Sequence, residues 1–81
     1  MKRFWKLDIS LAAKVLLSLD AHFPFWITIE QLAIEYDSSK PQSLINRLED
    51  VFRVLGVLGV VDFEERHGVF HFRSPDVFEE S

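Results

Sequence analysis

The sequence predicts an α+β fold in which three helices precede a two-stranded β-hairpin. Three successive segments repeat apolar residues at the three- and four-residue steps of a helix, and after Gly59 the repeat changes to the alternation typical of strands. The chain has 81 residues and no cysteine. We therefore expect one domain with a single core that is held together by packing alone.

The first predicted helix covers residues 8–20. Asp8 is a suitable N-cap, because its carboxylate can accept hydrogen bonds from the free amides of the first turn. Apolar residues occupy most of the circumference, so we expect this helix to be central and to lie across the others. The stripe predicted to face the core consists of Ile9, Ala13, Leu16 and Leu19 or Asp20, widened by Ala12, Val15 and Leu17.

A turn at residues 21–25 and a very short strand at residues 25–28 lead into the second predicted helix. Thr28 and Gln31 have the spacing of a capping box, in which each side chain bonds to the backbone amide of the other residue. A helix is therefore expected to begin at Ile29. Its predicted inner side consists of Ile29, Leu32, Ala33 and Tyr36.

The third predicted helix, residues 39–58, has the longest unbroken helical pattern in the chain. Ser39 is expected to be its N-cap, with Gln42 completing a second capping box and Pro41 in the first turn, where a missing amide hydrogen costs nothing. The predicted inner stripe consists of Leu44, Leu48, Val51, Leu55 and Leu58.

Two glycines could end this third helix. Gly56 and Gly59 can each adopt the left-handed conformation that closes a helix. We favour Gly59, because Leu58 continues the apolar stripe, and accept a cost of about 1 kcal/mol for Gly56 inside the helix.

The last predicted element is a hairpin formed by VVDFEER and VFHFRS around His67 and Gly68. A two-residue loop that ends in glycine suits a tight primed turn. The resulting register places phenylalanines together on one face and opposite charges together on the other, which stabilises the pairing. This register pairs Arg66 with Val69, Glu65 with Phe70, Glu64 with His71, Phe63 with Phe72 and Asp62 with Arg73.

The net charge of −4 argues against a general nucleic-acid binder, since such binding depends on lysine and arginine. Three of the thirteen acids lie in the last six residues, so residues 1–74 carry ten acids against nine bases. No apolar run approaches the roughly 18 residues of a membrane span, and no signal-type segment follows the N-terminus. We therefore expect a soluble, intracellular, cytoplasmic protein.

Enzymatic function is not expected. His22, His67 and His71 are too scattered for a helical metal pair, and Glu64 and Glu65 alternate on a strand and so face opposite ways. The chain has no glycine-rich phosphate loop and no nucleophile with a positioned base. We expect neither a metal site nor a cofactor.

The order helix, short strand, helix, turn, longer helix and hairpin resembles the winged helix-turn-helix family. The resemblance covers Asp8 to Arg73 and rests on the segment ITIEQLA, the serine-rich connector that follows the second helix, and SLINRLEDVFRVLGVLGVVDFEE. The last passage is similar to the junction between third helix and wing in prokaryotic regulators. The resemblance implies a winged helix domain at residues 1–74, with a possible N-terminal arm at 1–7 and an acidic tail at 75–81.

This resemblance implies a function as well. The third helix would enter the major groove of duplex DNA and the wing would contact the backbone, so the chain would be a sequence-specific transcriptional regulator, acting as a homodimer. Arginine, asparagine and glutamine are the side chains that read base edges, and lysine and serine hold phosphates. The implied DNA-binding residues are Lys40, Gln42, Ser43, Asn46, Arg47, Arg53, Arg66, His67 and Arg73.

The alternative is a winged helix that binds protein and not DNA, as an adaptor or scaffold. Phe4, Trp5 and Phe78 are then the expected surface anchors. The polar side of the third helix also fits a solvated face, in which Glu49 and Asp50 pair with nearby arginines. The two functions differ in one observable. DNA binding requires five cations to converge on one positive surface, whereas protein binding does not; they are Lys40, Arg47, Arg53, Arg66 and Arg73.

Overall fold

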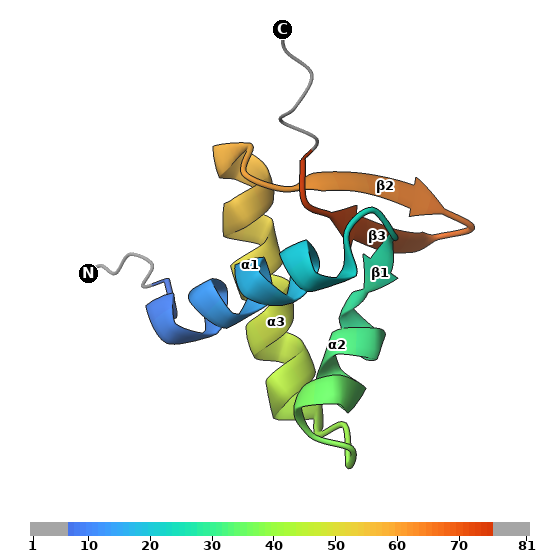
Figure 1. The fold of residues 1–81 in the computed structure, drawn as a ribbon. Coiled ribbons are helices and arrows are strands. Elements are labelled where there is room, and N and C mark those ends of the chain that lie inside the picture. Colours follow the sequence, from blue (N-terminus) through green and yellow to red (C-terminus); the bar gives the residue numbers. More distant parts are fainter. Residues whose placement is uncertain (1–6, 76–81) are drawn as a thin grey trace, which may run out of the picture.

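The computed structural model describes residues 7–75, which form three helices and one antiparallel sheet (Figure 1). The predicted α+β class is confirmed, and the order of elements is compatible with a winged helix. The elements are α1 (Ile9–His22), β1 (Ile27–Thr28), α2 (Ile29–Tyr36), α3 (Gln42–Leu58), β2 (Asp62–Arg66) and β3 (Val69–Arg73).

Helix α1 begins where the sequence predicts, and its buried side agrees with the prediction in part. Asp8 is the N-cap, and its Oδ1 accepts a hydrogen bond of 3.2 Å from the amide of Leu11. Ala12, Val15 and Leu19 are buried as predicted, but the prediction is wrong at Ile9 and Leu17, which are 74% and 70% exposed, and it omitted Leu11. A helix that is apolar almost all round does not define its buried side by pattern alone, and packing selects it. The buried residues are Leu11, Ala12, Val15 and Leu19.

The capping box that starts α2 is confirmed. The Thr28 hydroxyl accepts a 3.1 Å bond from the Gln31 amide, and the Gln31 side chain accepts a 2.7 Å bond from the Thr28 amide. The predicted inner side is also confirmed, with Leu32 and Ala33 buried and Ile29 and Tyr36 packed against the core.

Helix α3 begins at Gln42, three residues later than predicted, with Pro41 at the N-cap position. The expected capping box is wrong: the Ser39 hydroxyl and amide both donate to Oδ1 of Asp37, at 2.8 and 3.1 Å. Lys40 has a φ of 52°, outside the right-handed helical region. A residue that precedes proline disfavours that region for steric reasons, so the helix cannot extend back through Lys40.

The end of α3 agrees with the prediction. Gly59 has a φ of 77° and closes the helix, while Gly56 lies within it. A Cβ added at position 56 would lie 3.4 Å from the ring of Phe63, which is an ordinary van der Waals contact. The predicted stripe is wrong at Leu58, which is 63% exposed, and it omitted Phe52. The buried residues of α3 are Leu48, Val51, Phe52 and Leu55.

The hairpin has the predicted register at all five pairs from Asp62↔Arg73 to Arg66↔Val69. His67 and Gly68 both have positive φ, 53° and 80°, as a tight primed turn requires. The short strand β1 adds to the other edge of β3, so the sheet has the order β1-β3-β2. The sequence predicted this strand but not its partner.

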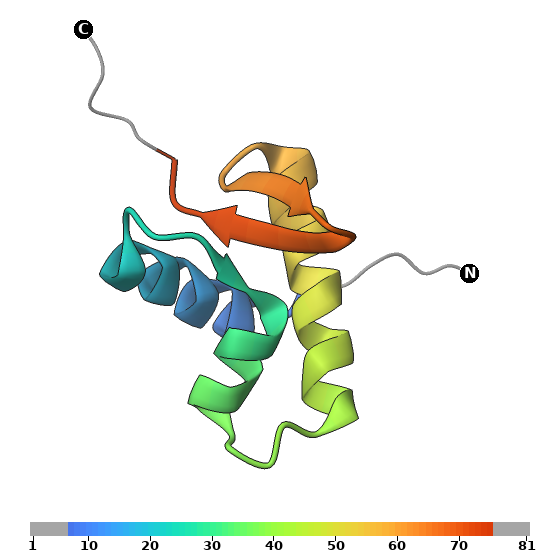
Figure 2. The same cartoon turned by 90° about the vertical axis from the view of Figure 1, so that its right-hand side faces the viewer.

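One face of the sheet packs on the C-terminal half of α3, where the rings of Phe52 and Phe72 stack with centroids 4.0 Å apart. Figure 2 shows the hairpin lying beside this half of α3, while the N-terminal half extends away from the sheet next to α2. Helix α1 covers α3 from another side. Within residues 7–75, no helix has the length and apolar character needed to cross a membrane.

Candidate functional site

The residues predicted to bind DNA lie in two separate groups. One group surrounds the start of α3, and the other follows the hairpin. In Figure 1 the α2–α3 connection lies at the bottom, whereas the hairpin tip points to the right. The first group consists of Lys40, Gln42, Ser43, Asn46 and Arg47, and the second of Arg66, His67 and Arg73. Arg53 lies apart from the first group, in the C-terminal half of α3.

Around the start of α3 the predicted side chains are exposed, and three of them, Gln42, Asn46 and Arg47, make hydrogen bonds. The side-chain Nε2 of Gln42 donates to Oδ1 of Asn46 at 3.1 Å, and Nη2 of Arg47 lies 2.6 Å from Oδ2 of Asp8. The Arg47 hydrogen bond and the Leu11 amide lower the pKa of Asp8 below its ordinary value. The sequence had suggested Glu49 or Asp50 as acidic partners, and neither contacts Arg47 within 4 Å.

Two further arginines are paired within their own elements. Arg53 donates to Asp50 on α3 at 2.9 Å, as the sequence suggested. At the wing, Nε of Arg66 donates to Oε2 of Glu64 at 2.7 Å. This bond lowers the pKa of Glu64 and raises the pKa of Arg66. Glu64 therefore contacts Arg66, although its register partner is His71.

Arg73 is part of the packing and not a free cation. Its side chain is only 27% exposed, its guanidinium lies 4.4 Å from the ring centroid of Trp26, and Nη2 is 3.7 Å from Asp62. Arg66 also lies over Trp26, at 5.5 Å. Trp26 was not among the residues predicted for a site. Its place opposite Arg73 follows from the pairing of Ile27 with Phe72, and the sequence did not predict that β1 pairs with β3.

Four of the five cations expected to form one positive surface are thus each next to an acid: Arg47, Arg53, Arg66 and Arg73. Lys40 is exposed and has no ion-pair partner among residues 7–75. Exposed pairs contribute little free energy, about 0–1 kcal/mol, so a phosphate could replace the acid. The charges nonetheless do not converge.

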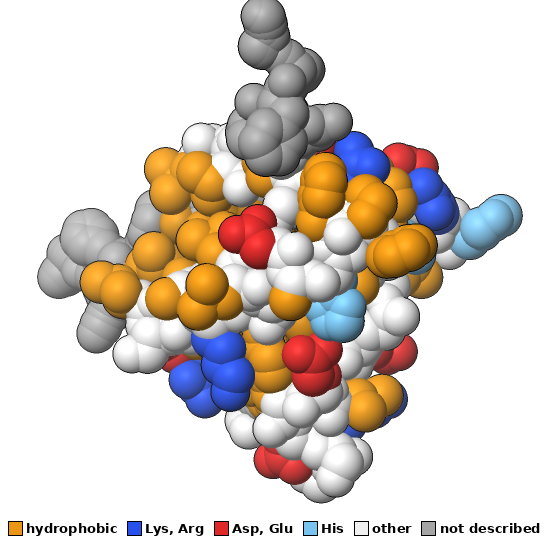
Figure 3. All heavy atoms as spheres, in the orientation of Figure 1, with side chains coloured by type: hydrophobic (Ala, Val, Ile, Leu, Met, Phe, Trp, Pro, Cys, Tyr) orange, Lys and Arg blue, Asp and Glu red, His pale blue; other side chains and the backbone are white. Residues whose placement is uncertain are grey.

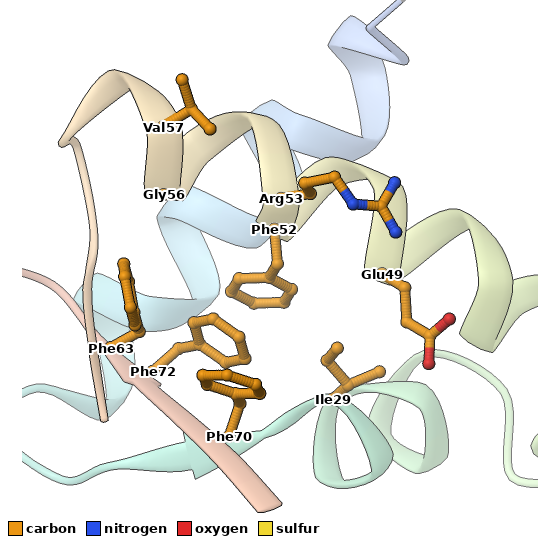
Figure 4. Close-up of a pocket in the computed structure, with 9 residues that line it drawn as sticks. All are labelled: Ile29, Glu49, Phe52, Arg53, Gly56, Val57, Phe63, Phe70 and Phe72. Atoms are coloured by element: carbon orange, nitrogen blue, oxygen red, sulfur yellow. The ribbon is translucent and has the colours of Figure 1, made fainter. Parts of the chain in front are cut away.

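A different surface stands out between α3 and the hairpin. An open groove with a volume of about 620 Å³ separates the C-terminal half of α3 from the inner face of β2 and β3 (Figure 4). This volume lies within the range of about 300–1,000 Å³ that is usual for ligand pockets. We call it the aromatic groove. It is lined by Ile29, Phe52, Gly56, Val57, Phe63, Phe70 and Phe72, with Glu49 and Arg53 at its rim.

Four phenylalanines give this groove its shape. Phe52 and Phe72 are buried and stack, which forms the floor. Phe70 meets Phe72 with ring centroids 6.3 Å apart and Phe63 edge-on at 6.1 Å. Phe63 and Phe70 remain 54% and 48% exposed, so an apolar wall faces solvent. Figure 4 shows these rings and Ile29 turned toward the same space.

Two exposed acids flank the aromatic groove: Glu49 lines its rim on α3, and Glu65 lies on the same face of the hairpin as Phe70. Glu49 on α3 is exposed and has no ion-pair partner among the described residues. Glu65 on β2 is exposed and pairs in register with Phe70, so by strand alternation it lies on the groove side of the hairpin. Arg53 is bound to Asp50. This arrangement suits an apolar group that carries positive charge.

No group of three or more histidines, aspartates and glutamates within residues 7–75 is placed to hold a metal ion. His22 instead lies 3.0 Å from Glu35, and Nδ1 of His71 lies 3.1 Å from the carbonyl oxygen of Val69. Phe4, Trp5 and Phe78, predicted as anchors for a partner, lie outside the described residues.

Comparison with known protein families, with curated protein sequences and with solved structures gives no match to this chain.

Proposed function

We propose that this chain is a winged helix domain that binds a partner protein through the aromatic groove. The observation that carries the proposal is the position of the groove: exposed rings of Phe63 and Phe70 lie where the third helix meets the wing. Three helices followed by a hairpin, with a short strand paired to it, support the winged helix assignment.

The expected ligand is a protein segment in which an aliphatic or aromatic side chain stands next to lysine or arginine. The apolar side chain would cover Phe63 and Phe70, and the cation would meet Glu49 or Glu65 at the rim. Burial of apolar surface would supply most of the affinity, at about 25 cal/mol per Å² removed from water. The acids would contribute mainly specificity.

The same groove is unsuited to nucleic acid. A phosphate backbone placed between α3 and the wing would approach Glu49 and Glu65, and like charges repel. Arg53 could offset only part of this repulsion, because Asp50 lies beside it at 2.9 Å.

The proposal can be tested with a library of random 12-residue peptides displayed on phage and selected against the immobilised full chain. We expect enrichment of peptides with an apolar residue next to lysine or arginine. Glu49→Lys should reverse the charge preference toward acidic peptides, since it changes one rim charge from negative to positive. Val57→Glu, at a position 83% exposed on the groove wall, should abolish selection without unfolding the chain.

Glu35→Lys is the matched control, because Glu35 is an exposed acid on α2 and pairs with His22 away from the groove. It should leave the selected peptides unchanged. If no peptide family is enriched, or if binding is indifferent to both Glu49→Lys and Val57→Glu, the groove is not the binding site.

A second candidate function is sequence-specific binding of duplex DNA. It is favoured by the exposed polar side chains in and before the first turns of α3, which include Lys40, a residue with no ion-pair partner among residues 7–75. Arg47 is 58% exposed in its pair with Asp8, so it could exchange this acid for a base or a phosphate. In this function the N-terminal half of α3 is the contact surface, and the aromatic groove is not used.

The test is titration of the protein into a random DNA duplex pool at low and at physiological salt, followed by sequencing of the retained DNA. An enriched motif whose binding weakens with salt would support DNA recognition. Arg47→Ala should then cost about 1–3 kcal/mol in a sequence-dependent way, and equal losses on all sequences would indicate a phosphate contact. No retention by the folded protein leaves the groove as the functional surface.

A further inference from the structure

Three rings of the aromatic groove form a corner. The planes of Phe63 and Phe70 are inclined at 68°, with ring centroids 6.1 Å apart. Phe72 lies beside Phe70 with ring centroids 6.3 Å apart, and their planes differ by only 28°. In Figure 4 Phe63 stands edge-on next to the flatter ring of Phe70. Two ring directions thus bound one space, which we call the phenylalanine corner.

Carboxylates lie close to the phenylalanine corner. Glu65 is the cross-strand partner of Phe70 and comes two residues after Phe63, so its side chain lies on the same face of the hairpin as both rings. Directly opposed residues in a sheet have Cβ atoms about 4.5–5.5 Å apart. Glu49 lines the groove from α3. The charge around the corner therefore favours a cation.

The lining side chains offer an entering cation few hydrogen bonds. Only Glu49 among them carries an acceptor, since Arg53 has donors alone and the others are apolar. Arg53 is bound to Asp50 at 2.9 Å, which offsets its charge. The three N–H donors of a lysine ammonium would lose water in this groove without equal replacement, at a cost in free energy. Trimethylation removes these donors and keeps the positive charge.

A second apolar surface lies over α1 and the nearby end of α3 (Figure 3). It exposes Ile9, Leu17 and Leu58, which are aliphatic, and Ile9–His22 contains no phenylalanine, tyrosine or tryptophan. Aliphatic side chains attract apolar groups, but they lack the negative ring face that attracts a cation. Of these two surfaces, the aromatic groove is the one that can hold a group both apolar and charged.

We propose that the aromatic groove binds the side chain of a trimethylated lysine in a partner protein, with its quaternary ammonium in the phenylalanine corner. This inference rests on the proposed function, because it specifies the side chain that the partner inserts. Ring faces attract a cation through their quadrupole, and grouped aromatic side chains recognise quaternary ammonium ligands in this way. The methyl groups contact the rings, while Glu65 and Glu49 balance the charge.

The size of the groove favours a residue of a protein chain over a free small molecule. A volume of about 620 Å³ is suited to a drug-sized ligand. A quaternary ammonium in the phenylalanine corner fills only part of this space. Figure 4 shows the groove continuing from the corner toward Ile29 and Glu49. The alkyl stem of the lysine and its flanking residues can occupy that part.

The test is a titration of the full chain, isotope-labelled at its phenylalanine rings, followed by NMR of the ring resonances. The probes are N-acetyl-lysine methylamide, its trimethylated form, and a neutral analogue in which carbon replaces the quaternary nitrogen. We expect the trimethylated probe to bind about tenfold more tightly than either of the others. The unmethylated probe retains N–H donors that the groove leaves unpaired, and the neutral probe lacks the charge that the rings attract.

Phe70→Leu tests the contribution of the ring. It keeps an apolar side chain at a position 48% exposed but removes the aromatic face. The preference for the trimethylated over the neutral probe should therefore fall from about tenfold to about threefold. Phe25→Leu is the matched control, because Phe25 is 71% exposed and does not line the groove. It should leave the preference unchanged, and circular dichroism checks the fold of both variants.

Choline carries the same head group without the peptide backbone. It should bind more weakly than the trimethylated lysine probe, which also contacts the part of the groove beyond the corner. Tighter binding of choline would make a free small molecule the ligand and overturn the proposed partner.

Three further results would overturn the inference. They are equal affinity for the trimethylated and neutral probes, a preference that Phe70→Leu leaves intact or that Phe25→Leu lowers equally, and no ring shifts with any probe at millimolar concentration. Phage-displayed peptides contain only unmodified lysine, so their enrichment without any preference for the methylated probe would reject this inference and leave protein binding by the groove in place. The failure of the inference is therefore distinguishable from that of the proposed function.

Discussion

The two halves of α3 share one buried stripe but differ in everything else they present. The N-terminal half, up to Arg47, extends away from the sheet and exposes amides, a serine and an arginine paired with Asp8. The C-terminal half, from Phe52 onward, lies under the hairpin and exposes Val57 and Leu58. One half is suited to polar recognition and the other to apolar contact.

This difference shows why a helix pattern alone does not assign function. The apolar positions that face the core follow from periodicity, because burial imposes it. The exposed positions carry no such constraint, and what they contact depends on which element lies beside them. Here the hairpin turns the C-terminal half into one wall of an aromatic groove.

The largest loss of stability is expected from a substitution in the core that both halves of α3 contact. Leu48 is fully buried, so Leu48→Ala should lower the free energy of unfolding by about 2–5 kcal/mol through lost packing and a cavity. Leu58→Ala, at a position 63% exposed, should change it by no more than about 0.5 kcal/mol in the monomer. Urea denaturation of both variants measures this. A similar loss for both would mean that the exposed end of α3 is covered.

The second largest loss of stability is expected at Gly59, the residue that ends the C-terminal half of α3. Gly59 has a φ of 77°, and this conformation costs a residue with a Cβ about 1–2 kcal/mol of free energy. Gly59→Ala should destabilise the chain by this amount. No other atom lies within 4 Å of the new Cβ, so a much larger loss in urea denaturation would contradict a purely conformational cause.

Much of the fold could be predicted because its signals are local. The Asp8 cap, the Thr28–Gln31 capping box, the Gly59 end and the register of the hairpin each depend on a few neighbouring residues. One error is local as well. The start of α3 was misplaced because Ser39 donates its hydrogen bonds to Asp37, and because Lys40, which precedes Pro41, has a φ of 52°.

The buried side of α1 was predicted only in part, because distant elements decide it. Its pattern is apolar over a wide face, and contact with the core buries Val15 and Leu19, as predicted, together with Leu11, which was not predicted. The other side, with Ile9 and Leu17, stays exposed. The choice depends on residues far away in the sequence, which periodicity within α1 cannot register.

A smaller effect of opposite sign is expected inside the C-terminal half. Gly56 lies within α3, where alanine is favoured over glycine by about 1 kcal/mol. The added Cβ would meet the Phe63 ring at 3.4 Å, and Phe63 is 54% exposed and free to shift. Gly56→Ala should therefore stabilise the chain by about 0.5–1 kcal/mol in urea denaturation. Destabilisation would show that the wall of the groove is rigid.

Only part of the candidate site could be predicted from the sequence. The exposure of Gln42, Asn46 and Arg47 followed from the polar side of α3. The aromatic groove did not, because Phe52 and Phe63 come from different elements and meet only in the folded chain. The partner of Arg47 was missed too, since Asp8 is 39 residues away.

The smallest effect concerns the Arg47–Asp8 pair beside the N-terminal half. The folded chain lowers the pKa of Asp8, so the charged carboxylate favours the folded state. This contribution is complete above the ordinary pKa of 3.8 and is lost as the pH falls through the lower folded value. Asp8→Asn keeps an oxygen to cap Leu11 but has no charge to lose.

Between about pH 5 and pH 2 the unfolding free energy of the native chain should therefore fall more steeply than that of Asp8→Asn. The lowered pKa values of Asp37 and Glu64 contribute a slope in the same direction, but equally in both proteins. Arg47→Met should give an intermediate slope, because the Leu11 amide still lowers the pKa of Asp8. A slope for Arg47→Met equal to that of the native chain would mean that Arg47 is not held by Asp8 in solution. Arg47 would then be free to bind a phosphate or a base. That result would favour DNA binding by the N-terminal half of α3 over protein binding at the aromatic groove.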